Sequence, residues 1–313
     1  MNHESFAAAR AYIMNHGRPV DQARFAYHFE NGDSMPVVRA LATYQNDDGG
    51  FGHGLEPDLR TPASSVIATS TGLAILREVN AAAGEPVVAD AIRYLLYVYD
   101  PGKGVWPIVP AAVEDAPHAP WWTYADSEVN FGRFLVNPRA ALAGHLYHFS
   151  PGQEILAGVS RSLLAHMDTI PDDDMGMHDL LAFLELAEAD NVPPDQRQKV
   201  VDKVRRAARH VVASDPAQWT DYALRPLQVA PTPDSLLAAD IDRAAIDANL
   251  DYEIERQSAD GVWDLTWSWD FVDAAAWAQA EKDWKGHHAV NTLRTLSAYG
   301  RLAQSWPQKA TPQ

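Results

Sequence analysis

A histidine and two carboxylates lie close together in the segment His53-Gly-Leu-Glu56-Pro-Asp58. Imidazole and carboxyl groups are the side chains that most often transfer protons in catalysis, and they also bind hard or borderline metal ions. In many loops the same groups only cap a helix or pair with a cation such as the nearby Arg60. Both interpretations stay open from the sequence, and we take His53, Glu56 and Asp58 as candidate catalytic residues.

Asp179 is a further catalytic candidate, at the start of a predicted helix and next to His178. A carboxylate in the first turn of a helix often only complements the helix dipole, so a structural role is the alternative. If one of these carboxyl groups is buried among aromatic side chains, its pKa rises and it becomes suited to donate a proton.

Aromatic side chains recur in the segments between predicted helices. Trp121 and Trp122 stand in a proline-rich loop, and Trp267 and Trp269 are two positions apart, so they share a face in an extended segment. Such rings can line an apolar or sugar pocket and can attract a cation. The predicted substrate-binding residues are Trp121, Trp122, Tyr222, Trp267, Trp269 and His288.

The elements that must position these residues are helices. Apolar residues recur at helical spacing in segments rich in Ala, Leu, Arg and Glu, whereas runs of alternating residues joined by tight turns are missing. We therefore predict an all-α chain. The predicted helices are Phe6–Asn15, Asp21–Glu30, Met35–Tyr44, Ser64–Val79, Val87–Tyr99, Pro138–Phe149, Glu154–His166, Met177–Ala189, Asp195–Val212, Ile241–Gln257 and Ala289–Ala303.

A short turn sequence repeats along the chain. Gln45-Asn-Asp-Asp-Gly-Gly-Phe51 and Gln257-Ser-Ala-Asp-Gly-Val-Trp263 share Gln, Asp, Gly and an aromatic residue at the same offsets, and Lys103-Gly-Val-Trp106 matches the last four places. With weaker copies near Asp168 and Asp215, the spacing is roughly 45 to 65 residues, which suits one helical hairpin per repeat. Asp and Gly permit a sharp turn, and we expect the glutamine amide to satisfy orphan carbonyl groups at the end of the preceding helix.

These repeats carry a family resemblance. Gln257–Trp263 resembles the QW motif of squalene and terpenoid cyclases, and Gln45–Gly52 resembles the DGGFG turn of protein prenyltransferase β-subunits. The resemblance implies an α/α toroid, a barrel of inner and outer helices built from about six helical hairpins. It also implies a terpenoid-cyclase-like enzyme of the cyclase, isomerase or lyase type. Such an enzyme would act on an apolar substrate, for example an isoprenoid, by carboxylate acid/base chemistry in an aromatic-lined central cavity.

The reactive motifs of those relatives are missing, which keeps two other functions open. The chain has no Asp-x-Asp-Asp acid motif and no helical Asp-Asp-x-x-Asp motif, and without cysteine it cannot form an Asp/Cys/His zinc site. One alternative is a carbohydrate-active α/α-barrel hydrolase or lyase, because paired carboxylates and exposed tryptophans also suit sugar chemistry. The other is a binding or scaffold toroid without catalysis.

Composition limits the partners. The 313 residues carry a net charge of -17, and such a field repels nucleic acids and anionic lipid surfaces. No apolar run reaches the length of a membrane span, and the N-terminal residues do not resemble a signal peptide. We therefore expect a cytoplasmic protein that binds no nucleic acid and has no integral membrane insertion. The resemblance implies a small apolar molecule as its substrate, and we expect no metal and no cofactor.

The expected organisation is a single domain over residues 1–313. Within it, we expect residues 1–33 to form an N-terminal helical extension and residues 304–313 to form a flexible tail. Length alone is compatible with one large domain or two ordinary ones.

Overall fold

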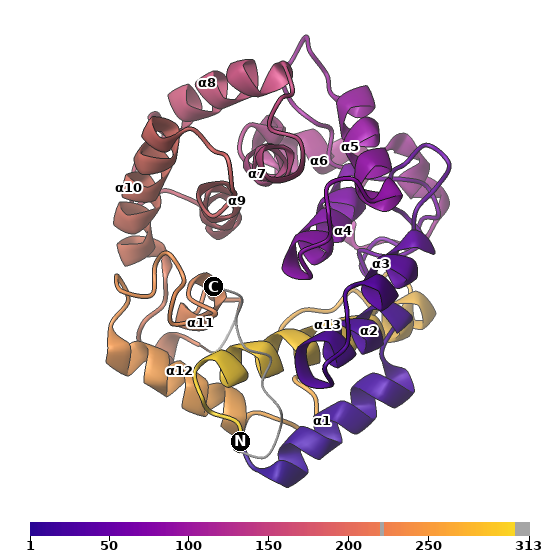
Figure 1. Cartoon of the computed structure of the whole chain (residues 1–313), viewed down its shortest axis with the longest axis vertical. Helices are drawn as coiled ribbons and strands as arrows, with labels where there is room; N and C mark the ends of the chain where they lie inside the picture. Colours follow the sequence, from indigo (N-terminus) through magenta and orange to yellow (C-terminus); the bar gives the residue numbers. More distant parts are fainter. Residues whose placement is uncertain (220–221, 304–313) are drawn as a thin grey trace. The chain divides into compact units, whose positions relative to one another are not determined.

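The computed structural model describes residues 1–219 and 222–303, and all of the regular structure in these residues is helical (Figure 1). Thirteen α-helices and four short 3₁₀ helices occur there, with isolated β-bridges but no strand. The prediction of an all-α chain is confirmed. Within the same residues, no helix has both the length and the apolar composition needed to cross a membrane.

The internal contacts divide the chain into two compact units. Unit 1 comprises Met1–Leu41 and Ala213–Gln313, and unit 2 comprises Ala42–Val212. The predicted extension, residues 1–33, belongs to unit 1, and the predicted tail, residues 304–313, lies outside the described residues. The single domain over residues 1–313 stays a prediction.

Unit 2 consists of two layers of helices. Three helices form a row in the order α4, α7, α9, and α5, α8 and α10 pack on one side of that row (Figure 1). The row is α4 (Val66–Glu78), α7 (Arg139–Phe149) and α9 (Met177–Ala187), and the second layer is α5 (Pro86–Val98), α8 (Ile155–Met167) and α10 (Pro194–Val211), with the short α6 (Tyr124–Asn130) between α5 and α7 in the chain.

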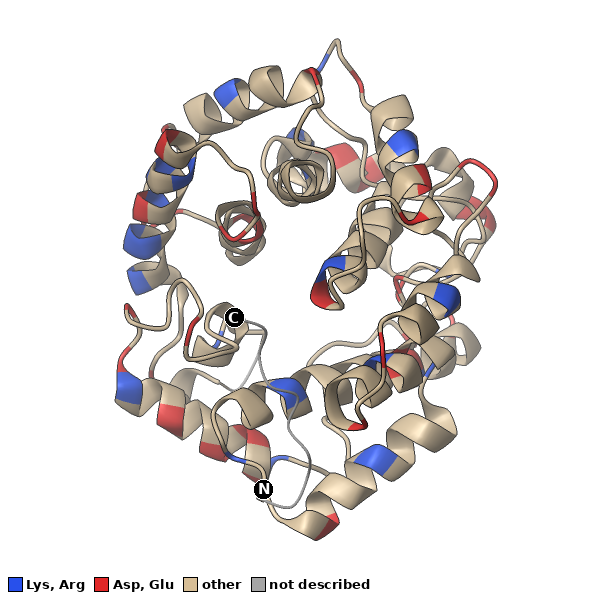
Figure 2. Ribbon diagram, in the orientation of Figure 1, with Lys and Arg blue, Asp and Glu red and all other residues tan. Residues whose placement is uncertain are grey.

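The sequences of the two layers differ as their surroundings require. In α7 every residue except His148 is buried, because neighbouring helices surround it. In α10 the buried residues recur at intervals of three and four, and charged residues of both signs fill the other positions (Figure 2). This is the pattern of an amphipathic helix with one solvated face.

Unit 1 is organised around one long helix. α13 (Ala274–Ala298) packs against α1 (His3–His16) and α2 (Pro19–Phe29), and α12 (Arg243–Glu255) packs against the single turn of α11 (Pro226–Val229). The remaining helix, α3 (Met35–Ala42), ends with a residue of unit 2.

The start of α13 corrects the sequence prediction, which placed it at Ala289. The helix begins 15 residues earlier, at Ala274, where the Asp273 carboxylate accepts hydrogen bonds from the N–H groups of Ala275 and Ala276. Gly286 argued against a helix in this segment, because glycine is unfavourable in helix interiors. Its role is close packing, because a Cβ atom there would lie 3.1 Å from the Cα atom of Gly17.

The two glutamines of the repeated turn make matching hydrogen bonds. The Gln45 amide donates to the carbonyl oxygens of Gly49 and Val87, at 2.9 Å each. The Gln257 amide donates to Gly261 at 3.0 Å and to Ser5 at 2.9 Å. Val87 and Ser5 lie in the first turns of α5 and α1, so each glutamine joins its own turn to the start of another helix. The predicted partner, the end of the preceding helix, is therefore wrong.

The carbonyl groups at the end of the preceding helix are met by tryptophan instead. The Trp106 indole N–H donates to the oxygen of Leu95, in the last turn of α5, at 2.8 Å. The Trp263 indole N–H donates to Glu253, in the last turn of α12, at 2.7 Å. Both rings are buried. Gln257–Trp263 is the copy that contains both residues: its glutamine contacts the start of α1 and its tryptophan contacts the end of α12.

Gly261→Ala should destabilise unit 1. Gly261 has φ +86°, and an added Cβ atom would lie 2.3 Å from the carbonyl carbon of Ala8 in α1. We expect a loss of roughly 2 kcal/mol or more in the free energy of unfolding, measured with urea. The control is Gly158→Ala in α8, where a Cβ atom meets nothing within 4 Å and should stabilise by about 0.5 kcal/mol. Equal stability of the two variants would contradict the role of this turn.

Candidate functional site

The predicted loop after the first motif combines exposed and buried polar residues. His53 is exposed with φ +55°, and its Nε2 atom lies 2.8 Å from the Asn46 side-chain oxygen. Its imidazole is thus tied to the turn that precedes it. Glu56 and Asp58 are 7% and 3% exposed, and the backbone of Asp58 accepts a hydrogen bond from Ala119. Their role as acids or bases stays a prediction.

The two neighbouring tryptophans of unit 2 have different surroundings. Trp122 is buried and stacks on Phe131, with ring centroids 5.1 Å apart and an interplanar angle of 8°. Trp121 is half-buried. Stacking of this kind fills a core as readily as it lines a site, so Trp121 is the member of the pair with surface left for a ligand.

Asp179 lies in the first turn of α9, as the sequence predicted. Burial raises the pKa of this carboxyl, while the charge of His166 and a hydrogen bond from the backbone of Asn137 oppose the rise. That backbone contact joins the start of α9 to the residues just before α7. Asp179 therefore has a structural role beside any chemical one.

A group that the sequence did not suggest lies across the row of helices in unit 2. Ser70 of α4, His145 of α7 and Glu185 of α9 meet side by side. The His145 Nε2 atom lies 3.2 Å from the Ser70 hydroxyl oxygen and 3.7 Å from Glu185 Oε2. Serine and carboxylate approach the same ring nitrogen, so this is not the relay of a serine hydrolase, in which they use opposite nitrogens.

The protonation states in this group are unusual. Surrounding protein raises the pKa of Glu185 to about 7, since burial outweighs the charge of Arg77, and Glu188 adds to the rise. Burial also lowers the pKa of His145 to about 3, with the charges of Arg77 and His148 adding to it. Near neutral pH, Glu185 therefore retains its proton in a large share of molecules while His145 is uncharged.

Glu185 remains open to solvent despite these surroundings. Its side chain is 47% exposed, whereas His145 is 1% exposed. Glu185 thus combines close protein surroundings, which raise the pKa of its carboxyl, with accessible surface. Such a group can meet a substrate and still hold a proton at neutral pH.

Aromatic rings gather in unit 1, and we call Tyr222, Trp267, Trp284 and His288 the aromatic cluster. Trp267 meets the other three rings edge-on at centroid distances of 6.1, 5.6 and 5.8 Å, in the order Tyr222, Trp284, His288. Trp284 and His288 stack at 5.4 Å, one helical turn apart on α13. The four rings retain exposed surface, and Tyr222 is 54% exposed.

The cluster brings together three of the predicted substrate-binding residues and leaves out Trp269. Trp269 is fully buried and packs on Trp277, at a centroid distance of 5.7 Å. Trp277 and Trp284 are seven positions apart on α13, so Trp267 and Trp269 do contact one face of that helix. Only Trp267 keeps accessible surface there.

Two carboxylates, each between two arginines, lie near the histidines of α13. In the Asp21 triad, Asp21 contacts Arg18 at 2.7 Å and Arg24 at 3.3 Å. All three side chains are at most 6% exposed. Arg24 also contacts His287 Nδ1 at 3.0 Å and donates to the Asn291 oxygen at 2.6 Å. This network fixes α2 against α13.

The second group, the Glu253 triad, lies on the side of His288. Glu253 contacts Arg225 at 3.3 Å and Arg256 at 3.6 Å, and both guanidinium groups lie over the Tyr252 ring, 5.6 Å from its centroid. Burial lowers the pKa of His288 to about 3, and the charges of His287, Arg256 and Arg225 add to this effect. His288 is therefore neutral.

Sequence reasoning missed Ser70, His145, Glu185 and Trp284. The first three are far apart in the chain and only helix packing joins them, yet Glu185 is a single charged residue in the apolar run LLAFLELA. That interruption was the available signal. Trp284 was missed because the start of α13 was misplaced.

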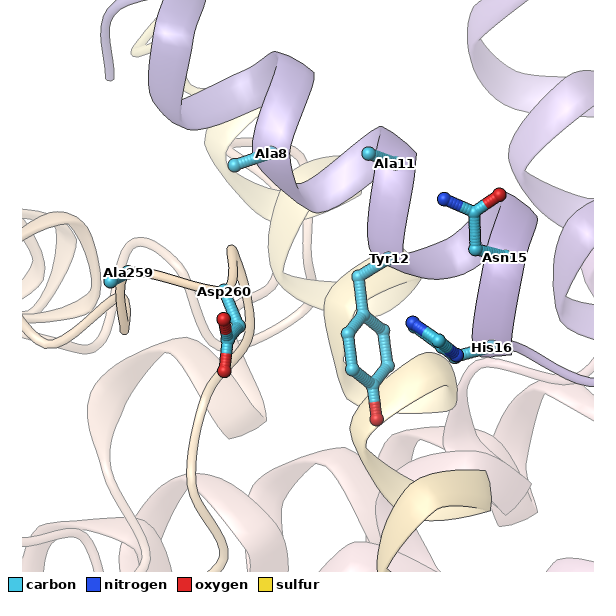
Figure 3. A pocket seen from close by; sticks show the side chains of 7 residues that line it. All are labelled: Ala8, Ala11, Tyr12, Asn15, His16, Ala259 and Asp260. Atoms are coloured by element: carbon cyan, nitrogen blue, oxygen red, sulfur yellow. The ribbon is translucent and has the colours of Figure 1, made fainter.

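No group of three or more His, Cys, Asp or Glu side chains in the described residues is arranged to hold a metal ion. A groove of about 420 Å³ lies in unit 1 along α1 (Figure 3). It is lined by Ala8, Ala11, Tyr12, Asn15, His16, Ala259 and Asp260, and none of these is a predicted site residue.

Asp21→Asn should strongly destabilise the protein, because it leaves Arg18 and Arg24 buried without their counter-charge. We expect a loss of about 3–5 kcal/mol in the free energy of unfolding at pH 7. The control Asp247→Asn, which breaks an exposed pair with Arg243, should change stability little.

The pH dependence provides a second check on the Asp21 triad. Burial would raise the pKa of Asp21, but the charge of Arg18 and the contacts from His287 and Arg18 outweigh it and hold the pKa below its ordinary value. The contribution of Asp21 is therefore fully present above about pH 4 and is lost as pH falls toward the native pKa. The gap between wild type and Asp21→Asn should narrow in acid. A gap that widens would contradict this assignment.

Comparison with known proteins leaves the site to be interpreted from its geometry. No family model matches the chain, and no curated protein matches it. The functional interpretation below therefore rests on the residues described above.

Proposed function

We propose that this chain is an acid/base enzyme that acts on an apolar substrate, with Glu185 as its proton donor. The observation that carries the proposal is a carboxyl that is accessible to a substrate and has its pKa raised to about 7. General acids work best when their pKa lies near the working pH, and an ordinary glutamate is almost fully ionised there.

The neighbours of Glu185 suit this role. His145 is neutral, so it cannot neutralise the acid by holding a second charge, and its Nε2 atom lies 3.7 Å from the carboxyl. After proton transfer, an Nε2–H group at that position would stabilise the carboxylate with a small approach. The Ser70 hydroxyl contacts the same Nε2 atom, and its hydrogen bond can rearrange when the Nε2–H group turns toward the carboxylate.

The apolar substrate class is supported by the composition of the helix row as a whole rather than by the groups nearest the carboxyl, which are His145, Arg77 and Glu188. The three helices of the row contribute mainly Ala, Leu, Val and Phe. A proton donor in such surroundings is placed to protonate a weakly basic group, such as a carbon–carbon double bond, that water would otherwise shield. Glu185 replaces Asp58, Glu56 and Asp179 as first candidate for the acid in this proposal, and those residues remain secondary candidates.

The proposal includes the terpenoid-cyclase-like α/α toroid as the fold. Two features support it: the repeated turns with equivalent glutamine and tryptophan hydrogen bonds, and the two helical layers of unit 2. The cyclases and prenyltransferases that the motifs resemble use turns of this kind to join outer to inner helices, and we propose the same role for the first motif, which lies between α3 and α4 in the chain.

Glu185→Gln should abolish turnover, because glutamine keeps the shape of the side chain and cannot give a proton. We expect at least a 100-fold fall in rate on linear isoprenoid hydrocarbons and alcohols, with products separated by gas chromatography and mass spectrometry. The control Glu154→Gln changes an exposed carboxylate at the start of α8 and should leave the rate unchanged. Full activity of Glu185→Gln on any substrate that wild type converts would refute the acid role.

The wild-type rate should also fall as pH rises through about 7, because the folded protein then loses the Glu185 proton. Stability follows the same sign. The pKa is raised above its unfolded value, so the protonated carboxyl stabilises the fold below about pH 4.5, and this contribution is lost as pH rises toward 7. Thermal unfolding of Glu185→Gln against wild type should therefore show a relative gain at pH 8 over pH 4. A constant difference would contradict the raised pKa.

A further inference from the structure

The two well-matched copies of the repeated turn use their aspartates differently. Asp48 and Asp260 occupy the same place in the two copies. The Asp48 carboxylate accepts hydrogen bonds from the N–H group of Gly50 at 2.9 Å and from the Ser64 hydroxyl at 2.7 Å. In the first copy, the aspartate therefore stabilises the turn and ties it to the segment that leads into α4.

In the second copy, a serine takes over this hydrogen bond. The N–H group of Val262, which corresponds to Gly50, donates to the Ser258 hydroxyl oxygen at 3.3 Å. Asp260 is exposed, and its carboxylate forms no hydrogen bond or ion pair with the part of the chain that the structure describes. The turn closes without this carboxylate, which is left available to a ligand.

Asp260 lines the groove of about 420 Å³ that runs along α1 (Figure 3). Ala8, Ala11 and Tyr12 are spaced by three and four positions, so they share one face of α1 and line the groove together. In Figure 3 the Tyr12 ring lies between the Asp260 carboxylate and the imidazole of His16. The groove thus combines apolar methyl groups, an aromatic ring and one carboxylate, in a volume typical of small-molecule sites.

Contacts between α1 and the second turn hold the groove in shape. The Gln257 amide joins the turn to the carbonyl oxygen of Ser5 at 2.9 Å, and Gly261 lies so close to Ala8 that a Cβ atom has no room. A ligand therefore meets walls that are already in place, and little conformational entropy is lost when it binds.

The charges around the groove favour a cation. None of the residues that line it is a lysine or an arginine. From α13, which packs against α1, the charges of Glu281, Asp283 and Lys285 act on the hydroxyl of the groove's tyrosine, as does that of Asp260. Lys285 is itself paired with Glu281 at 2.9 Å and with Asp264 at 3.0 Å. This set contains four carboxylates and one lysine.

More distant groups do not reverse this sign. Arg10 of α1 is paired with Glu30 at 2.7 Å, and the Asp21 triad beyond the end of α1 has one excess positive charge. Unit 1 as a whole has 19 Asp and Glu residues against 12 Lys and Arg, so the groove belongs to an acidic part of an acidic chain. Such a field attracts cations and repels anions.

We propose that this groove binds a small arylalkyl amine, whose ammonium group pairs with Asp260 and whose apolar body lies on Ala8, Ala11 and the Tyr12 ring. An ammonium group donates charge-assisted hydrogen bonds to a carboxylate and is attracted to the face of an aromatic ring. A hard metal ion is a poorer occupant, because it needs several oxygen ligands and the groove has a single carboxylate.

The test compares three probes of similar shape: 2-phenylethylamine, 2-phenylethanol and 3-phenylpropionate. Binding to the full chain is measured by calorimetry and by saturation-transfer NMR at low salt, where exposed ion pairs are screened least. We expect the amine to bind about tenfold more tightly than the alcohol, and the acid to bind most weakly. Equal binding of amine and alcohol, tighter binding of the acid, or no binding of the amine would overturn the proposal.

Asp260→Asn is the decisive variant, because asparagine keeps the shape of this exposed side chain and removes its charge. It should weaken the amine about fivefold to tenfold and leave the alcohol unchanged. The matched control is Asp247→Asn, which removes one exposed negative charge elsewhere in unit 1 and should bind as wild type does. An equal loss in both variants would reduce the effect to the general field, and unchanged affinity in Asp260→Asn would remove the carboxylate from the site. Either result would overturn the proposal.

Two substitutions of Tyr12 test the aromatic wall. Tyr12→Phe keeps the ring and should keep the affinity for the amine, whereas Tyr12→Leu removes it and should weaken the amine about threefold. Equal affinity of the two variants would contradict a contact between the ammonium group and the ring.

The same probe separates this inference from the proposed reaction. Glu185→Gln should bind 2-phenylethylamine with wild-type affinity even if it has lost all turnover. A weakened affinity there would place the amine at Glu185 and would overturn the assignment to the groove.

Discussion

Each well-matched copy of the repeated turn depends on one amide side chain that has two acceptors. Gln45 and Gln257 each bridge their own turn to the first turn of a distant helix, and the close approach leaves no room for a Cβ atom at Gly49 or Gly261. In the second copy, the Trp263 indole also bonds a carbonyl oxygen in the last turn of the helix before the turn. Seven residues therefore join the first turn of α1 to the last turn of α12.

The first of these joints also determines where α4 begins, because the backbone of Phe51 makes hydrogen bonds with Ser65 and with the Thr69 hydroxyl. The first motif leads through Ser64 and Ser65 into α4, and the Ser65 hydroxyl caps that helix by accepting from Ala68. Once α4 is placed, Ser70 faces the row formed with α7 and α9, where it meets His145. A local turn thus controls a contact between residues 75 positions apart.

The two units differ in how they stabilise carboxyl groups that protein atoms surround. In unit 1, carboxylates are kept ionised by paired arginines, and the neighbouring histidine His288 is held neutral. In unit 2, Glu185 has no such partner at its carboxyl and its pKa rises instead, although the guanidinium of Arg77 binds its backbone oxygen. The first arrangement keeps a buried carboxylate ionised, and in the second the carboxyl retains its proton near neutral pH.

The sequence predicted local features well and long-range meetings poorly. The turn motif could be recognised because its Asp and Gly form a local turn, whereas the distant partners of its glutamines, Val87 and Ser5, could not be predicted. Most predicted helix boundaries agree with the structure within a few residues. The start of α13 was missed because Gly286 lies in the helix interior, where its contact with Gly17 requires a residue without a Cβ atom.

The candidate site shows the same division. Tyr222, Trp267 and His288 were predicted, since aromatic residues in loops are recognisable one by one. Glu185 was not predicted, because an isolated glutamate in an apolar helix has no local signature of a raised pKa. That property arises from the packing of α4, α7 and α9 around it. No single segment of the sequence shows which helices will pack together.

The most direct test of the central claim is the titration of the Glu185 carboxyl itself. Carbon-13 labelling of glutamate, with the Glu185 signal assigned by its absence in Glu185→Gln, would follow that carboxyl by NMR from pH 3 to pH 9. The proposed acid predicts a midpoint near 7. A midpoint near 4.5, the ordinary value for glutamate, would show an ionised carboxylate at neutral pH and would contradict the account.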